Sequence, residues 1–189
     1  MLDFFDDQTF NGIDYTKSKL VKGEYDNCTF IDCNFENVHA SNIQFVECEF
    51  VNCNFSNTIV KNTAFKIASF TECKLLGVKF NECDQFLLSF QFFDCQLNVA
   101  SFYQLNIKNT VFKNCNLQEV DFTEANMSNT VVDNCDLKNA IFQQTNLESV
   151  NFSTSFNFNI NPSENKMKNS VFSKENLEGL LKEFQIKVE

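Results

Sequence analysis

The chain of 189 residues contains no tryptophan and no arginine, and it has only one proline and four glycines. With so little glycine and proline, flexible linkers are not expected, and the length fits a single domain. No stretch approaches the roughly 18 consecutive apolar residues of a membrane-spanning helix, so we expect no membrane insertion. The first seven residues, MLDFFDD, are acidic and lack the basic start of a secretory signal, which argues against export.

The motifs of common catalytic and cofactor sites are also missing. His39 is the only histidine, and no Ser/His/Asp set, glycine-rich phosphate loop or dinucleotide fingerprint accompanies it. The nine cysteines include no CxxC pair, whereas zinc sites use paired ligands two to four residues apart. We therefore predict no enzyme, no cofactor and no metal site. Many cysteines without an export signal indicate reduced thiols and a cytoplasmic location.

A five-residue repeat dominates what the sequence does contain. Residues 28–57 include CTFID, CNFEN and CNFSN, in which a small residue, a polar residue and a large apolar residue follow one another. All fifteen residues taken at steps of five from Phe10 to Phe80 are apolar, and so are all twelve from Leu97 to Phe152. Neither a helix nor a strand has this period. The pattern predicts short straight sides joined by corners, with the large residues inside.

The spacing of the cysteines indicates the number of sides. Cys33, Cys53 and Cys73 are twenty residues apart, and Cys95 and Cys115 repeat the interval. Twenty residues make four pentads, so we infer a four-sided coil whose turns stack about 4.8 Å apart. The cysteines occupy the small inward position, where a free cysteine packs as a small hydrophobe. Disulfides between stacked cysteines are the alternative interpretation.

The repeat resembles that of the pentapeptide-repeat family over roughly residues 8–160. This resemblance implies an all-β solenoid, a right-handed quadrilateral β-helix. We predict that residues 1–160 form the β-helix and that residues 161–189 form a C-terminal cap and dimerisation helix.

A break in the register is predicted within residues 81–96. The step from Phe80 to Leu97 is 17 residues where three pentads take 15, so two residues are inserted. Gln85 also falls on an expected core position. We favour a corner bulge whose extra apolar residues fold back on the core. A protruding contact loop is the alternative.

The C-terminal segment predicts a short helix after the solenoid stops near Pro162. Ser173 is placed to cap it, Gly179 weakens it by about 1 kcal/mol relative to alanine, and residues 186–189 alternate like a strand. We expect its apolar stripe to join two chains end to end. At about 4.8 Å per coil, such a dimer spans roughly two turns of B-DNA. The stripe consists of Leu177, Leu180, Leu181 and Phe184.

The net charge of −10 favours a basic partner and opposes direct nucleic-acid binding. Two segments, residues 23–60 and residues 114–137, contain acids and no lysine. Simple solubility of a stacked-strand rod is the alternative explanation of this charge. The predicted partner-binding acids are Glu24, Asp26, Asp32, Glu36, Glu47, Glu49, Glu119, Asp121, Glu124, Asp133 and Asp136.

One branch of the pentapeptide-repeat family binds type II topoisomerases and includes the quinolone-resistance proteins, which are acidic, dimeric rods of DNA-like size. The resemblance therefore implies a DNA mimic that binds gyrase or topoisomerase IV and can protect the enzyme from quinolones. This chain has only a two-residue insertion where the plasmid-borne resistance proteins carry long loops. The alternative hypothesis is a structural or adaptor module with a different protein partner.

Overall fold

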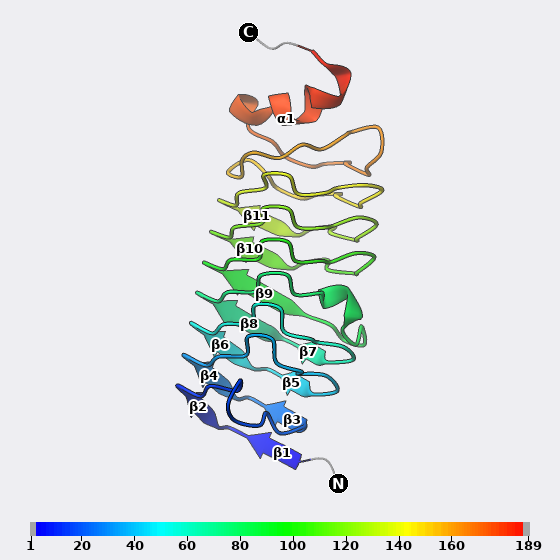
Figure 1. The fold of residues 1–189 in the computed structure, drawn as a ribbon. Helices are drawn as coiled ribbons and strands as arrows, with labels where there is room; N and C mark the ends of the chain where they lie inside the picture. The colour runs from blue at the N-terminus through cyan, green and yellow to red at the C-terminus, as the bar shows by residue number, and fades with distance from the viewer. Residues whose placement is uncertain (1–2, 187–189) are drawn as a thin grey trace.

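The computed structural model describes residues 3–186, which form a four-sided β-helix of stacked parallel coils followed by a short helical cap (Figure 1). Strands form on two of the four sides. The larger sheet has the order β11-β10-β9-β8-β6-β4-β2 and contains β2 (Thr9–Asn11), β4 (Thr29–Ile31), β6 (Glu49–Val51), β8 (Ala68–Thr71), β9 (Phe90–Phe93), β10 (Val111–Lys113) and β11 (Val131–Asp133). The smaller sheet has the order β1-β3-β5-β7 and contains β1 (Asp3–Asp6), β3 (Gly23–Asp26), β5 (Gln44–Val46) and β7 (Ala64–Lys66).

The pairing register confirms the four-sided coil. Phe10 pairs with Phe30 and Phe30 with Phe50, so like residues stack every twenty positions. The predicted cysteine ladder lies on one side, where the backbone N–H of Cys53 donates to Cys73 Sγ at 3.4 Å. We call the side formed by the larger sheet the first side, and we number the other three in the order in which the chain reaches them. The smaller sheet forms the N-terminal part of the fourth side.

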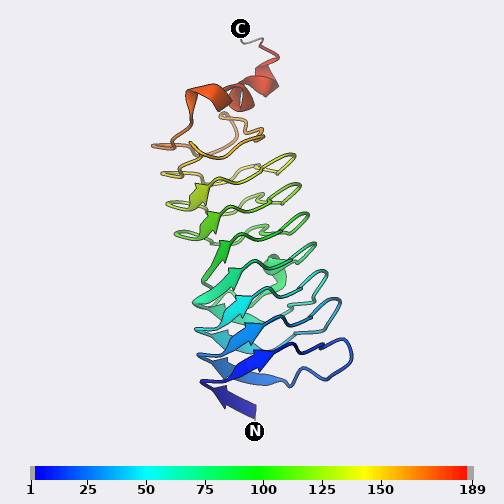
Figure 2. The same cartoon turned by 90° about the vertical axis from the view of Figure 1, so that its left-hand side faces the viewer.

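A left-handed backbone residue closes each regular corner. Twenty-seven described non-glycine residues have positive φ, and asparagine is the commonest of them. Asparagine tolerates this conformation because its short side chain can hydrogen-bond locally. Backbone geometry therefore determines which residue types occupy the last position of the pentad. Figure 2 shows the resulting stack of coils from the side.

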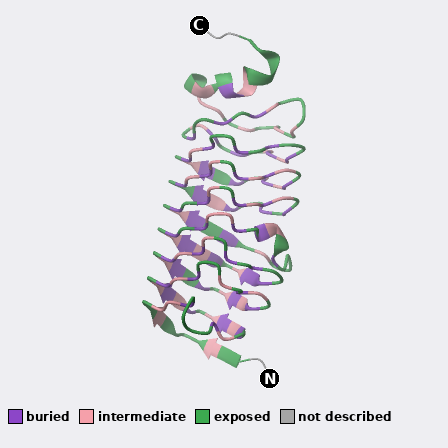
Figure 3. Cartoon of the chain, in the orientation of Figure 1, coloured by how far each residue is buried: buried purple, intermediate pink, exposed green. Residues whose placement is uncertain are grey.

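The large apolar residues fill the interior as predicted (Figure 3). Both apolar files are buried apart from Phe10, which is half-buried in the first coil. Phenylalanine rings stack along a side and meet edge to face across the interior: Phe50 lies 4.8 Å from Phe70 in a stacked pair and 5.1 Å from Phe55 in an edge pair. These are the ring geometries that aromatic quadrupoles favour.

The small inward position accepts cysteine, alanine or threonine because its polar members bond to the backbone. Thr63 Oγ1 donates to the Ala40 carbonyl at 2.6 Å, and Thr145 Oγ1 donates to the Phe122 carbonyl at 2.8 Å. The cysteine thiols make the equivalent contact, as Cys53 does to Phe30 at 3.4 Å. All nine cysteines are buried and free of disulfides.

We expect the thiols to be unreactive until the protein unfolds. Burial raises the pKa of Cys48 to about 12, so almost no thiolate forms there at neutral pH, and burial keeps the other eight thiols out of reach of a reagent. A thiol reagent should label all nine cysteines in denaturant and almost none in buffer, with no zinc or disulfide found by mass spectrometry. Rapid labelling of the native protein would contradict this packing.

The register break lies between β8 and β9, where paired residues are 22 apart: Phe70 pairs with Phe92. A 3-10 turn, η1 (Phe80–Glu82), precedes it. Leu88 packs against the core, but Phe86 and Leu87 are 69% and 65% exposed. The prediction that the extra apolar residues fold back is therefore wrong for these two.

Gln85, which falls on an expected core position, is exposed. The backbone N–H of Phe86 instead bonds the Asp84 carboxylate at 2.9 Å, which fixes an outward turn.

The C-terminal cap is shorter and more broken than a single helix. It consists of η2 (Lys174–Asn176), α1 (Glu178–Leu181) and η3 (Lys182–Phe184), and residues 187–189 of the expected strand lie outside the described part. Ser173 precedes η2 but makes no capping bond, and its hydroxyl is buried without a partner, so the predicted cap is wrong. None of the helices within residues 3–186 has the length and apolar character that crossing a membrane requires.

Candidate protein-interaction surface

The eleven acids predicted to bind a partner all lie outside the core, but they do not form one face. Each is half-buried or exposed. The winding distributes them over all four sides because each coil turns the chain through a full circuit. The first side and its closing corner hold Asp32, Glu49 and Asp133; the second holds Glu36, Glu119 and Asp136; the third holds Asp121 and Glu124; the fourth holds Glu24, Asp26 and Glu47.

One corner column brings acids of different coils together. The corner that closes the first side carries Asp32, then Asn52, Glu72, Asp94 and Asn114, all with positive φ. Asparagine amides donate to the carboxylates, to Asp32 at 2.6 Å and to Asp94 at 2.9 Å. The sequence analysis missed Glu72 and Asp94. Steps of 20 from Asp32, and one of 22 across the inserted residues, would have found them.

The carboxylates are largely uncompensated by lysine. Within residues 3–186 one ion pair is present, from Lys17 Nζ to Asp14 at 2.7 Å, and this hydrogen bond, followed by those from Thr16, lowers the pKa of Asp14 to about 2. Side-chain amides donate hydrogen bonds to several of the other acids, as Gln104 does to Glu124 at 2.8 Å. The negative charge therefore remains available to an incoming cation.

Asp136 shows how neutral partners keep a half-buried carboxylate ionised. Burial alone would raise its pKa, but hydrogen bonds from Asn157 at 2.8 Å and Gln118 at 2.6 Å outweigh burial and lower the pKa. Both donors are uncharged, so they hold the carboxylate in place without cancelling its charge.

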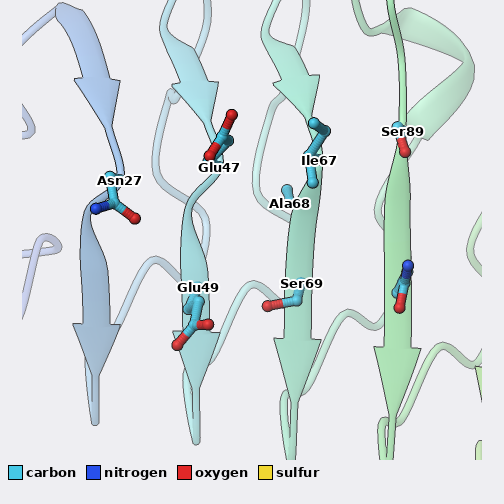
Figure 4. Close-up of a pocket in the computed structure, with 8 residues that line it drawn as sticks. Asn27, Glu47, Glu49, Ile67, Ala68, Ser69 and Ser89 are labelled. Carbon is cyan, nitrogen blue, oxygen red and sulfur yellow. The ribbon is translucent and has the colours of Figure 1, made fainter.

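Two neighbouring hollows of opposite charge lie where the fourth side meets the first. Figure 4 shows one of about 340 Å³, whose charged lining residues are Glu47 and Glu49. The other, of about 520 Å³, is charged only by Lys66 and Lys108. Ile67 lines both hollows. We call the larger hollow the groove; Leu87 and Leu88 of the inserted segment line it, and the sequence analysis did not anticipate it.

The one histidine of the chain lies apart from the acids of the corner column. His39 is exposed on the third side and pairs through its backbone with Ile59. No group of three or more histidine, cysteine or acidic side chains in residues 3–186 is placed to hold a metal ion.

The predicted dimer stripe divides between the cap's inner and outer faces. Leu180 packs against the core and Leu181 is half-buried, while Leu177 and Phe184 are 41% and 54% exposed. The stripe thus both closes the rod and leaves apolar side chains outside.

Gly179 sets how closely this cap sits. A Cβ there would lie 2.5 Å from both the ring and the carbonyl oxygen of Phe158, and the Gly179 carbonyl accepts a 3.0 Å bond from Ile160. Glycine therefore lets the cap reach the last coil.

Two family models match the chain. The pentapeptide repeat region matches residues 78–152, and the eight-copy pentapeptide repeats match residues 28–66 and 48–84. No curated protein sequence matches.

Similar solved structures are distant. A trypsin-treated form of QnrB1, a plasmid-mediated fluoroquinolone resistance protein, is 15% identical, with 99% of this chain and 100% of that chain covered and a TM-score of 0.44. HetL from the cyanobacterium Nostoc, involved in heterocyst differentiation regulation, is 12% identical over 90% and 83% of the chains, with a TM-score of 0.41. A pentapeptide repeat protein of the Arabidopsis thaliana thylakoid lumen is 21% identical over 59% and 66%, with a TM-score of 0.30.

Proposed function

The chain belongs to the pentapeptide-repeat family, and from this premise we propose that it is a non-catalytic, cytoplasmic protein-interaction module that mimics DNA toward a type II topoisomerase. In this mode of binding, its carboxylates replace the DNA phosphates on the DNA-binding surface of the enzyme. The observation that carries this proposal is a surface of net charge −10 on which, within residues 3–186, Asp14 alone forms an ion pair with a lysine.

The arrangement of the acids supports an electrostatic mode of binding. The corner that closes the first side places Glu72 and Asp94 on adjacent coils about 4.8 Å apart, and Asn52 separates Glu72 from Asp32. Duplex DNA presents one charge per roughly 1.7 Å of its axis, so the mimic relies on several sides of the rod together. Binding should weaken as salt shortens the Debye length from about 10 Å at 0.1 M.

Reversing the charge of Glu119, Asp121 and Glu124 together should weaken binding to gyrase or topoisomerase IV about tenfold or more, because three attractive contacts become repulsive. These residues flank the third side in one coil, and none is buried. The measurement is a supercoiling titration at two salt concentrations, with and without a quinolone. Inhibition should follow stoichiometry, not incubation time, because no turnover occurs.

A matched neutral variant separates charge from structure. Glu119→Gln, Asp121→Asn and Glu124→Gln retain oxygen acceptors for the bonds from Thr123 and Gln104. This variant should lose less affinity than the reversed one, and both should melt near the wild type. If the wild type at micromolar excess neither inhibits nor protects gyrase, nor binds topoisomerase IV salt-sensitively, the mimic proposal fails.

We expect the C-terminal cap to join two copies end to end through Leu177 and Phe184, which remain exposed beside the buried part of the stripe. Truncation before Ser173 should then give monomer or aggregate, measured by light scattering. Phe184→Glu is the milder variant, because a charge at an exposed position disfavours the contact without removing the cap. A monomeric wild type would show that the stripe serves only its own coil.

An adaptor role with another protein partner is the second candidate. The wide distribution of the acids favours it, since four sides each carry some and no side carries most. Salt-insensitive partner binding that survives the triple charge reversal would select this candidate over the mimic.

A further inference from the structure

The groove beside the inserted residues combines apolar walls with positive charge in a strongly acidic protein. Its walls include the side chains of Leu87, Leu88 and Ile67, and its only charged lining residues are Lys66 and Lys108. Ile67 and Leu87 are 64% and 65% exposed. Exposed apolar patches rimmed by polar residues often mark protein-interaction sites or binding grooves.

The backbone pairing between successive coils is interrupted at the same place. On the fourth side Ala64 bridges Asp84, and the next bridge on this side within residues 3–186 joins Asn106 to Asn126. The segment from Gln85 to Ser89 lies between these rows and replaces a regular pentad. The stacked sides therefore part here, and the groove occupies the place where the ladder is missing.

Backbone conformation provides a second observation. Three apolar residues within the described chain have positive φ: Ile67, Leu87 and Val99. Bulky and β-branched residues are outliers in this region, where the equivalent corners of other coils carry asparagine, an acid, serine or glycine. Two of the three line the groove. Local backbone strain and exposed apolar side chains therefore occur together at the groove.

We propose that this groove binds an extended peptide segment of a partner protein that carries apolar side chains alternating with carboxylates. The apolar side chains pack between Leu87, Leu88 and Ile67, and the carboxylates pair with Lys66 and Lys108. Lys66 Nζ lies 3.0 Å from Gln44 Oε1, which holds the ammonium group in place. A basic peptide is disfavoured because it meets two ammonium groups and no carboxylate in the groove's lining.

This inference is independent of topoisomerase binding, because the acids of that proposal lie outside the groove lining. Only Glu47 and Glu49 are close, and they line the hollow on the other side of Ile67. A partner bound in the groove would therefore leave the third-side acids free.

The test uses fluorescence polarisation with the full chain and three labelled heptapeptides: GDLDLDG, GKLKLKG and GDSDSDG. We expect measurable binding of the first alone, weakened by salt. Lys66→Glu with Lys108→Glu should reduce that binding at least tenfold. Lys61→Glu, an exposed lysine of the third side, is the matched control and should leave it unchanged.

The variants Ile67→Asn and Leu87→Asn separate recognition from stability. Asparagine suits the left-handed corner, so each variant should relieve backbone strain and raise Tm by roughly 2–4 °C. Each should also weaken GDLDLDG binding. The proposal is overturned if the acidic and basic peptides bind alike or not at all, if Lys61→Glu acts like the groove variants, or if the asparagine variants bind as well as the wild type.

Discussion

Replacing Phe50 by alanine should destabilise the fold by about 3–5 kcal/mol, the range for deleting a buried aromatic side chain. Phe50 is fully buried in β6. Its ring stacks on Phe30 at 5.0 Å and Phe70 at 4.8 Å, and it meets Phe45 and Phe55 edge to face. A solenoid coil contacts mainly its neighbours, so the cavity weakens two coil interfaces at once.

Phe10→Ala is the matched control for Phe50→Ala. Both residues belong to the same file on the first side, but Phe10 is half-buried in β2, the edge strand of the larger sheet. Its removal should cost only about half of the 1.5–3 kcal/mol gained by burying such a side chain fully. Urea unfolding followed by circular dichroism measures both. Equal losses would mean that stacking along the file contributes little.

Gly179→Ala should lower stability by about 1–3 kcal/mol, as expected when an extra methyl group is forced into a packed site. In an ordinary exposed helix this change would add about 1 kcal/mol of stability. Here the new Cβ meets the ring and the carbonyl oxygen of Phe158, and backbone cannot yield as a flexible side chain can. The cap should therefore lift from the last coil and lose the bond between Ile160 and Gly179.

Hydrogen exchange localises the effect of Gly179→Ala. The amide of Ile160 should exchange faster, while amides of the central coils keep their protection. Gly12→Asn is the control. Gly12 has φ of +65°, a conformation that asparagine suits, and a Cβ added there would lie more than 4 Å from any residue other than its chain neighbours. A Gly179→Ala protein more stable than the wild type would show that helix propensity outweighs the contact.

The interior of the solenoid was predictable from the sequence because its period is built into every coil. Phe30, Phe50 and Phe70 recur at the spacing that brings them into register, so local pattern and tertiary contact carry the same information. The acids were also predictable as exposed residues, because Glu119 and Glu124 occupy the fifth position of their pentads, outside the core.

The insertion illustrates what the pattern cannot resolve. Its length of two residues was evident from the step between Phe80 and Leu97, but the outward course of Phe86 and Leu87 was not. A segment outside the repeat has no neighbour of the same type to stack on. Its path therefore depends on particular bonds, such as that of Phe86 to Asp84.

By itself, the sequence determined the coil, its four sides and its two apolar files, since one residue type at a fixed interval can satisfy burial only by stacking. Tertiary structure alone decided how the acids divide among the sides, where the groove of Lys66 and Lys108 opens and why position 179 is glycine. These features depend on distances between segments 20 or more residues apart at places where the repeat is broken or ends. There, packing and backbone geometry replace periodicity as the constraint.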